Sequence, residues 1–306
     1  MPTEIFYDPI FLKHETGRHP ECKDRLVGIA GLLDKNSKYK FLKPREATQQ
    51  DLELNHSPEY IAYIKSVCDE GGGMLDADTV VSSLSFRAAC FAAGAMLEAI
   101  DRSIKKQRYN AFCCVRPPGH HAEHKHAMGF CLFNNVAIGA KYAHNKYNIN
   151  RILIIDFDLH HGNGTQDSFY NDNKVLYFSV HQYPYYPGTG SFSETGEGKG
   201  RGLTINAPLP AGSTDKEYVS ALKEILTPKA LIFKPELILI SAGFDAYIKD
   251  PLGGMKITIE GFKEIGKAIK SISEKTCNKT ISVLEGGYNI NDLPLCVEAY
   301  LEGIDD

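Results

Sequence analysis

The chain has 306 residues, of which 43% are hydrophobic and 24% charged, a composition typical of soluble globular proteins that excludes a disordered or fibrous one. Its 34 basic and 38 acidic side chains leave a net charge of −4, so we expect no direct binding to nucleic acid or to anionic membranes. No apolar run approaches the roughly 18 residues of a membrane-spanning helix. The start of the chain lacks the basic and apolar regions of a secretory signal, and the eight cysteines contain no CxxC pair. We therefore expect a cytoplasmic protein with reduced thiols.

Short apolar or β-branched runs alternate along the chain with stretches of helical periodicity. The expected strands are residues 3–7, 109–115, 151–156, 174–181, 236–242 and 279–284. The expected helices are one capped by Ser57 with Pro58 at its first position, one over residues 86–104, and one that begins after Thr258. This alternation predicts a single α/β domain over residues 1–306, with a mostly parallel sheet and helices on both of its faces.

Polar and glycine-rich segments follow five of these strands. They are residues 116–121, 156–164, 181–190, 243–245 and 285–288. Most of the eleven histidines also lie between residues 120 and 181. In open α/β folds, ligands bind beyond the carboxyl ends of the parallel strands. We therefore expect the functional site at that edge of the sheet.

The segment after one apolar strand carries Asp156, Asp158 and His160 at every second position, so the three side chains share one side. Two carboxylates that converge there repel one another and lose their hydration unless a cation is present. Asp245, which follows another strand, can supply a further oxygen. Asp158, His160 and Asp245 would then form a three-ligand Zn²⁺ site with a position open for water. A helix cap or a hydrogen-bonded core residue is the simpler interpretation of any one of them, but the set favours a metal.

A second transition metal is not expected. A two-metal site of the ureohydrolase kind would place further carboxylates at the positions that are here Gly162 and Tyr247. Neither residue has a carboxylate, so the sequence predicts one zinc ion per chain.

The neighbouring segment holds His120 and His121, either of which can take a proton from a water molecule and return it to a leaving amine. Asp156 can orient one imidazole and Asn163 the other. Tyr288, which follows two glycines, can donate its hydroxyl to a developing oxyanion. By position alone Tyr288 is one of sixteen tyrosines at the end of a loop, so its role depends on the rest of the site.

Other motifs suggest different chemistry. Residues 120–124 match the inverted zinc-protease pattern HxxEH, but that assignment gives no function to Asp158, His160 and Asp245. The glycine-rich residues 196–202 lack the spacing of a phosphate-binding loop and indicate a flexible loop. Cys113 and Cys114 lie in an apolar strand, which favours a place in the core over a nucleophilic role.

The order of the motifs is more specific than any one of them. They are RPPGHH at 116–121, GFC at 129–131, DFDLHHGNG at 156–164, YPGTG at 186–190, AGFD at 242–245 and EGGY at 285–288. In this order they resemble the zinc-dependent histone deacetylase family, most closely its class II and bacterial amidohydrolase-like branch. The resemblance runs from residues 17–21 to Tyr288, which is nearly the whole chain. It implies an arginase/deacetylase-type α/β fold whose mostly parallel sheet has eight strands.

The resemblance also implies a role for individual residues. The zinc ligands would be Asp158, His160 and Asp245. The catalytic residues would be His120, His121, Asp156, Asn163 and Tyr288, with His121 as the general base and acid. The substrate-binding residues would be Gly129, Phe130, Tyr186 and Leu252, with Phe130 and Tyr186 as the walls of a tunnel for the acylated lysine, the Gly129 carbonyl near the amide and Leu252 at the rim. A structural K⁺ would lie near Asp156, Asp158, His160, Ser179 and Val180.

Three positions depart from the family pattern. Tyr186 replaces a frequent Phe in the tunnel wall, and Cys22 with Lys23 replaces Arg-Pro in an entrance loop. Leu252 lies where acetylpolyamine-selective relatives have an acidic gate. The expected function is zinc-dependent hydrolysis of acetylated or short-acylated lysine in proteins or peptides. The alternative is an acetylpolyamine amidohydrolase, which acts on a small acylated amine with the same site. An acyl-group reader without turnover is disfavoured because Tyr288 and both histidines are retained.

Overall fold

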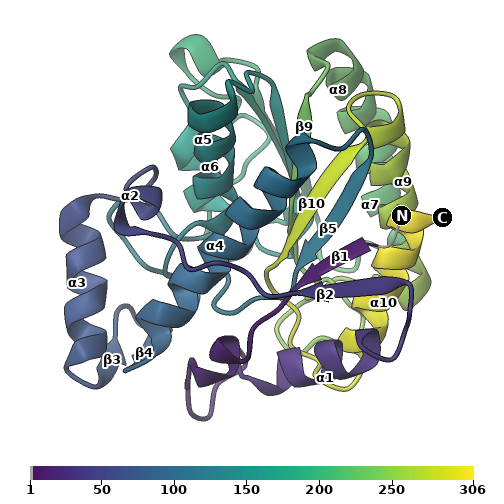
Figure 1. Ribbon diagram of the computed structural model, residues 1–306. Helices are drawn as coiled ribbons and strands as arrows, with labels where there is room; N and C mark the ends of the chain where they lie inside the picture. The colour runs from purple at the N-terminus through teal and green to yellow at the C-terminus, as the bar shows by residue number, and fades with distance from the viewer. Residues whose placement is uncertain (1–2) are drawn as a thin grey trace.

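A computed structural model describes residues 3–306, and its central feature is one eight-stranded sheet (Figure 1). Every pair of neighbouring strands in this sheet is parallel. In spatial order the strands are β2 (Tyr39–Leu42), β1 (Thr3–Phe6), β5 (Tyr109–Cys113), β10 (Lys279–Leu284), β9 (Leu237–Ala242), β6 (Ile152–Asp156), β7 (Val175–Gln182) and β8 (Thr204–Leu209). Two short strands, β3 (Gly72–Met74) and β4 (Val80–Ser82), form a separate antiparallel pair. The predicted fold class is therefore confirmed.

Helices cover both faces of the sheet, as predicted. They are α1 (Asp24–Leu33), α2 (Gln49–Leu52), α3 (Pro58–Asp69), α4 (Ser85–Ile104), α5 (Asn135–Tyr147), α6 (Asn163–Phe169), α7 (Asp215–Ser220), α8 (Thr227–Phe233), α9 (Ile259–Glu274) and α10 (Leu293–Asp305). The 3₁₀ helices η1 (Pro9–Lys13) and η2 (Gly198–Gly200) and the π-helix η3 (Ala221–Leu226) complete the helical elements. In Figure 1, α4 and α5 lie on one side of the sheet and α9 and α10 on the other. Within residues 3–306, no helix is long and apolar enough to cross a membrane.

The predicted helix starts at Ser57 and Thr258 are both present. The Ser57 side chain accepts a hydrogen bond from the Tyr60 amide at 3.2 Å, and Pro58 occupies the first position of α3. The Thr258 hydroxyl accepts one from the Gly261 amide at 3.0 Å and begins α9. Each cap satisfies a backbone N–H that the helix leaves unpaired, an interaction typically worth about 1 kcal/mol.

The sequence did not predict the edge strands β2 and β8. Both are only partly buried, so neither has the continuous apolar run that marks a strand covered on both faces. β8 also contains Pro208, which cannot donate a hydrogen bond to a ladder and is tolerated on an edge strand. The inner strands could be predicted because helices cover both of their faces, so that each has a continuous apolar run in the sequence.

The five strands followed by polar segments are neighbours in the sheet. They occupy the consecutive positions β5, β10, β9, β6 and β7. Because all are parallel, their carboxyl ends meet at one edge, and the segments 116–121, 156–164, 181–190, 243–245 and 285–288 all leave from that edge. The fold thereby places side chains that are far apart in the sequence next to one another.

Candidate active site

Asp158, His160 and Asp245 converge beyond the ends of β6 and β9. One possible ligand atom from each lies within 4.8 Å of the other two. His160 Nδ1 is 2.9 Å from Asp245 Oδ2 and 3.2 Å from Asp158 Oδ1. Both carboxylates are buried, while 12% of the His160 side chain is exposed. The structure therefore brings together the three residues predicted as metal ligands, with an accessible side at the imidazole.

The electrostatics of this group favour a bound cation. Burial and the charge of Asp158 raise the pKa of Asp245. Burial lowers the pKa of His160, but its hydrogen bonds to Asp158 and Asp245 raise it more, to about 10. A proton on His160 is thus stabilised because its positive charge offsets the repulsion between the two buried carboxylates, Asp158 and Asp245. A divalent cation bound by the two carboxylates and a neutral imidazole would offset the same repulsion. This donor set fits Zn²⁺ with positions left open.

No carboxylate occupies either position that a second transition metal would need. A Cβ atom on Gly162 would lie only 2.2 Å from Asp156 Oδ2, so any side chain is excluded there. The Tyr247 hydroxyl donates to Asp292 Oδ2 at 3.0 Å.

The two adjacent histidines have different partners. His120 Nδ1 is 3.1 Å from Asp156 Oδ2, and His121 Nδ1 is 2.8 Å from Asn163 Oδ1. Burial lowers the pKa of His120, but the charges of Asp158 and Asp156 raise it more, to about 10. Burial and the neighbouring His120 and His160 hold the pKa of His121 well below its usual range. His120 therefore favours the charged form, and His121 the neutral form.

A narrow cavity of about 100 Å³ leads to these groups. It is lined by Asp78, His121, Gly129, Phe130, His160, Tyr186, Leu252 and Tyr288. All four residues predicted to bind the substrate, Gly129, Phe130, Tyr186 and Leu252, are among them. The Phe130 and Tyr288 rings meet edge to face with centroids 5.8 Å apart, and those of His121 and Tyr186 do so at 5.2 Å. One cavity thus unites an apolar wall, a neutral imidazole and the candidate metal ligand His160.

Tyr288 contributes a protonated phenol to this cavity. The residue is 8% exposed, and burial together with the charge of Asp245 raises its pKa well above the usual range. Its backbone amide donates to Asp250 Oδ2 at 2.6 Å, which fixes the turn that carries it. The Arg25 guanidinium lies 5.0 Å from the centre of its ring. The phenol therefore stays a hydrogen-bond donor at ordinary pH.

The entrance loop, where Cys22 and Lys23 depart from the family pattern, is held by the residues beside them. Glu21 is fully buried and accepts hydrogen bonds from Arg116 at 2.7 Å and from Arg25 at 3.1 Å. Arg25 in turn donates to the Gly287 carbonyl at 2.6 Å. The loop is thereby tied to the turn of Tyr288.

The residues implied for potassium share Asp158 and His160 with the candidate metal group and add Asp156, Ser179 and Val180. Ser179 on β7 pairs in register with Asp156 on β6, and both are fully buried. The Ser179 hydroxyl is 2.8 Å from His181 Nδ1, and the adjacent Val180 is also buried. Asp156 Oδ1 accepts from the Asp158 amide at 3.2 Å, which connects this region to the candidate ligands.

The alternative HxxEH motif does not form a site. The segment is not helical, and His124 Nδ1 lies 2.6 Å from the Asn55 carbonyl oxygen. Glu123 accepts from the Asn163 side chain at 2.8 Å. A zinc protease site of that kind needs its two histidines on one helical face, so the motif is coincidental. Residues 196–202 contain the short turn η2.

Sequence reasoning missed two residues near the cavity. Asp78 lines it from the loop between β3 and β4, which follows no strand of the main sheet. Glu285 was recognised as part of a motif but was given no role, although it is fully buried beside His120. The signal for Glu285 was an acidic residue directly after an apolar strand; no comparable signal marked Asp78.

Comparison with known proteins agrees with this geometry. The family model described as "Histone deacetylase domain" matches residues 19–304. A protein of Archaeoglobus fulgidus named "Probable deacetylase" is 39% identical over 297 residues, covering 95% of this chain and 82% of its own. "Histone deacetylase 14, chloroplastic" of Arabidopsis thaliana is 39% identical over 303 residues, covering 92% of this chain and 72% of its own. The solved structure titled "Crystal Structure of HDA15 HD domain" superposes with a TM-score of 0.93 at 34% identity, covering 99% of this chain and 89% of that one.

The fold and the site together define an arginase/deacetylase-type α/β architecture with its candidate metal group at the carboxyl edge of a parallel sheet. The chain belongs to the histone deacetylase family. This membership supports a deacetylase activity.

Proposed function

We propose that this chain is a zinc-dependent deacetylase that hydrolyses the amide of acetylated or short-acylated lysine side chains, releasing a carboxylate and the free amine. The observation that carries the proposal is the meeting of three groups at one narrow cavity. These groups are the buried Asp158, His160 and Asp245, the neutral His121, and the protonated Tyr288.

Asp158, His160 and Asp245 would hold the zinc ion. Zinc, when bound, polarises the amide carbonyl and makes water more acidic. A structural K⁺ near Asp156 and Ser179 belongs to the same proposal and rests on the family resemblance.

The chain's own residues would move the protons. His121, held by Asn163 through Nδ1, takes a proton from the attacking water at Nε2 and returns it to the departing amine. His120, held by Asp156, keeps a positive charge beside His121. Tyr288 donates its hydroxyl to the carbonyl oxygen as negative charge develops there. The roles follow from position, because His121 lines the cavity and His120 does not, and the opposite directions of their pKa shifts agree with this assignment.

The cavity wall suits the stem of a lysine. Phe130 and Tyr186 supply aromatic surface for its methylene groups, with Gly129 and Leu252 completing the wall. A reader that binds the acyl group without turnover would not need His121 and Tyr288 to face the same cavity. This geometry therefore favours an enzyme over a reader, and we propose an acylated protein or peptide as its substrate. A cytoplasmic location is proposed with it, because all eight cysteines are unpaired thiols.

An acetylpolyamine is the second candidate substrate, because one acidic residue does face the cavity. Asp78 lines it and can attract a second cation, whereas Leu252 gives no such attraction. We expect a neutral acetyl-lysine peptide to have the higher kcat/KM when compared with acetylspermidine in one assay. A preference for acetylspermidine by about tenfold, equivalent to about 1.4 kcal/mol in transition-state binding, would assign the polyamine function instead. Asp78→Asn is the matched control: it should lower only the acetylspermidine value if Asp78 recognises the second cation.

We expect one tightly bound zinc per chain, because Gly162 and Tyr247 leave no carboxylates for a second. Elemental analysis of the dialysed protein measures this ratio directly. His124→Ala should keep its zinc, since that side chain contacts Asn55 rather than the candidate ligands. Two transition metals per chain after dialysis, or loss of zinc from the His124 variant, would contradict the assignment.

A further inference from the structure

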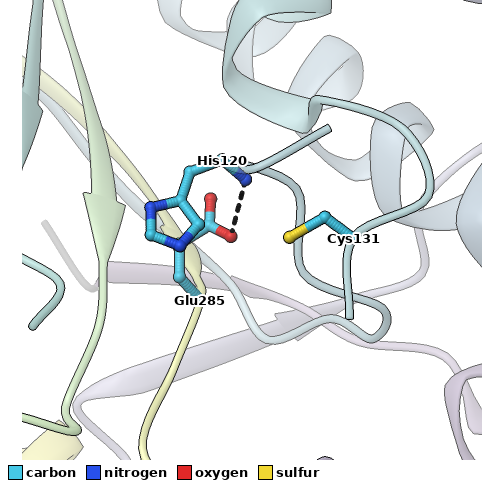
Figure 2. Close-up of side chains that lie close together, drawn as sticks. All are labelled: His120, Cys131 and Glu285. Carbon is cyan, nitrogen blue, oxygen red and sulfur yellow. Dashed lines mark hydrogen bonds between the residues drawn. The ribbon is translucent and has the colours of Figure 1, made fainter. Parts of the chain in front are cut away.

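A second group of potential metal ligands lies behind the tandem histidines. His120, Cys131 and Glu285 are all buried, and one potential ligand atom from each lies within 4.8 Å of the others. Figure 2 shows the hydrogen bond between the Glu285 carboxylate and the backbone nitrogen of His120, with the Cys131 side chain next to this pair. The group is either a further metal site or a set of hydrogen-bonding anchors.

The hydrogen bonds of Glu285 decide between these interpretations. Its Oε2 accepts from the Gly119 amide at 2.7 Å and from the His120 amide at 3.2 Å. Its Oε1 accepts from the Ser241 hydroxyl at 3.1 Å. The Cys131 thiol donates to the Gly129 carbonyl at 3.3 Å. The carboxylate thus has three donors already aimed at it, so its burial is explained without a metal ion.

These bonds join three strand ends. Glu285 directly follows β10 and begins the turn that carries Tyr288. Gly119 and His120 lie in the segment after β5, and Ser241 lies on β9. The amide of Gly286, next in the chain, donates to Asp158 Oδ2 at 2.8 Å. Glu285 is therefore the side chain that ties the turn of Tyr288 directly to the turn of the tandem histidines.

We propose that Glu285 is a positioning residue that holds the His120–His121 turn in register with Tyr288 by accepting the two backbone N–H groups of Gly119 and His120. The proposal rests on the deacetylase function above, in which His121 and Tyr288 act on the same amide. Without the acceptor, two buried N–H groups lose their partner, and the histidine turn shifts relative to the phenol. A misplacement of about 1 Å can cost roughly 10²-fold in rate.

Glutamine at this position separates hydrogen bonding from charge. In Glu285→Gln the amide oxygen can replace Oε2 and the amide nitrogen can donate to Ser241 Oγ, so all three bonds can persist in a neutral side chain. Glu285→Met has similar length and no strong acceptor. Glu285→Asp keeps the charge but shortens the reach by one methylene.

The experiment measures kcat, KM, zinc content and amide hydrogen exchange of residues 116–121 in these three variants. We expect kcat on acetyl-lysine peptide to fall roughly 10- to 100-fold in Glu285→Met and Glu285→Asp. KM should change less than kcat, and the zinc content should be unchanged. Exchange at Gly119 and His120 should speed up in both variants. Glu285→Gln should keep kcat within about threefold of wild type and keep the slow exchange.

Ser282→Ala is the matched control, because it removes a buried hydrogen bond from the same strand, the 2.8 Å contact with Tyr300, away from the cavity. It should lower stability without changing kcat. If Glu285→Met does not fold, the comparison of Glu285→Asp with Glu285→Gln still decides the question.

Several results would overturn the proposal. Normal kcat in Glu285→Asp would show that the hydrogen bonds are dispensable. A Glu285→Gln variant as impaired as Glu285→Met would show that the negative charge, and not the hydrogen bonds, is required. Loss of a metal ion from Glu285→Gln would make Glu285 a metal ligand. The exchange measurement needs no substrate, so it tests whether Glu285 holds the Gly119 and His120 amides independently of activity. If the wild-type protein fails to hydrolyse acetyl-lysine, that result contradicts the proposed function and leaves the positioning role of Glu285 to be judged by exchange.

Discussion

Replacing Asp245 with alanine is expected to remove zinc and amide hydrolysis together. Asp245 Oδ2 lies 2.9 Å from His160 Nδ1 in the candidate metal group, and without it only Asp158 and His160 remain as protein ligands. Catalytic zinc sites generally use three. Because metal-ion catalysis is worth several kcal/mol and each 1.4 kcal/mol is tenfold, kcat should fall by roughly 10³-fold or more.

The structural cost of this change must be separated from the loss of the metal. Asp245 Oδ1 also accepts from the Leu159 amide at 2.9 Å, and leaving that donor unpaired costs about 1–3 kcal/mol. Asp8→Ala is the matched control, because Asp8 is a buried aspartate that accepts the Ile10 amide at 2.8 Å and does not line the cavity. The control should keep its zinc and its activity. Full zinc occupancy in Asp245→Ala, measured after dialysis, would mean that the third ligand is a different residue.

The position of Asp245 beside His160 could be predicted because sheet geometry determines it. The two residues are 85 positions apart, yet each lies in the polar segment after an inner strand of a parallel sheet, β6 for His160 and β9 for Asp245. Inner strands are buried on both faces, so their apolar runs are visible in the sequence, and the polar segment after each run marks a strand end. The same reasoning placed the tandem histidines and Tyr288 at this edge.

The residues that the sequence did not reveal depend on contacts that no local pattern encodes. Glu285 accepts the amide of Gly119 across 166 positions, and the Arg25 guanidinium reaches the Gly287 carbonyl across 262. Periodicity predicts which face of an element is buried, but it does not show which backbone donors a buried carboxylate will meet. Asp78 was missed for a different reason, because its loop lies outside the main sheet.

Replacing Tyr288 with phenylalanine should leave the fold and the metal intact while kcat collapses. Tyr288 lines the cavity, and its hydroxyl forms no hydrogen bond with another residue that the structure describes, so its removal leaves no buried partner unpaired. It acts only when the carbonyl oxygen gains negative charge. Loss of one oxyanion donor typically costs about 2.7–4 kcal/mol, or roughly 10²–10³ in kcat. KM for the acetyl-lysine peptide should change much less, because the ground-state amide needs this donor less.

Two ligands distinguish this role from a structural one. A hydroxamate inhibitor, held chiefly through the metal, should bind Tyr288→Phe with only a modest loss, and zinc content should equal that of wild type. A trifluoroacetyl-lysine peptide, whose carbonyl is already activated by fluorine, should recover part of the lost rate, because it depends less on the missing donor. A destabilised active site would instead weaken the hydroxamate and slow both substrates equally. Near-normal kcat of Tyr288→Phe on the ordinary acetyl substrate would show that another group stabilises the oxyanion, since a donor that acts only in the transition state cannot be removed without a cost in kcat.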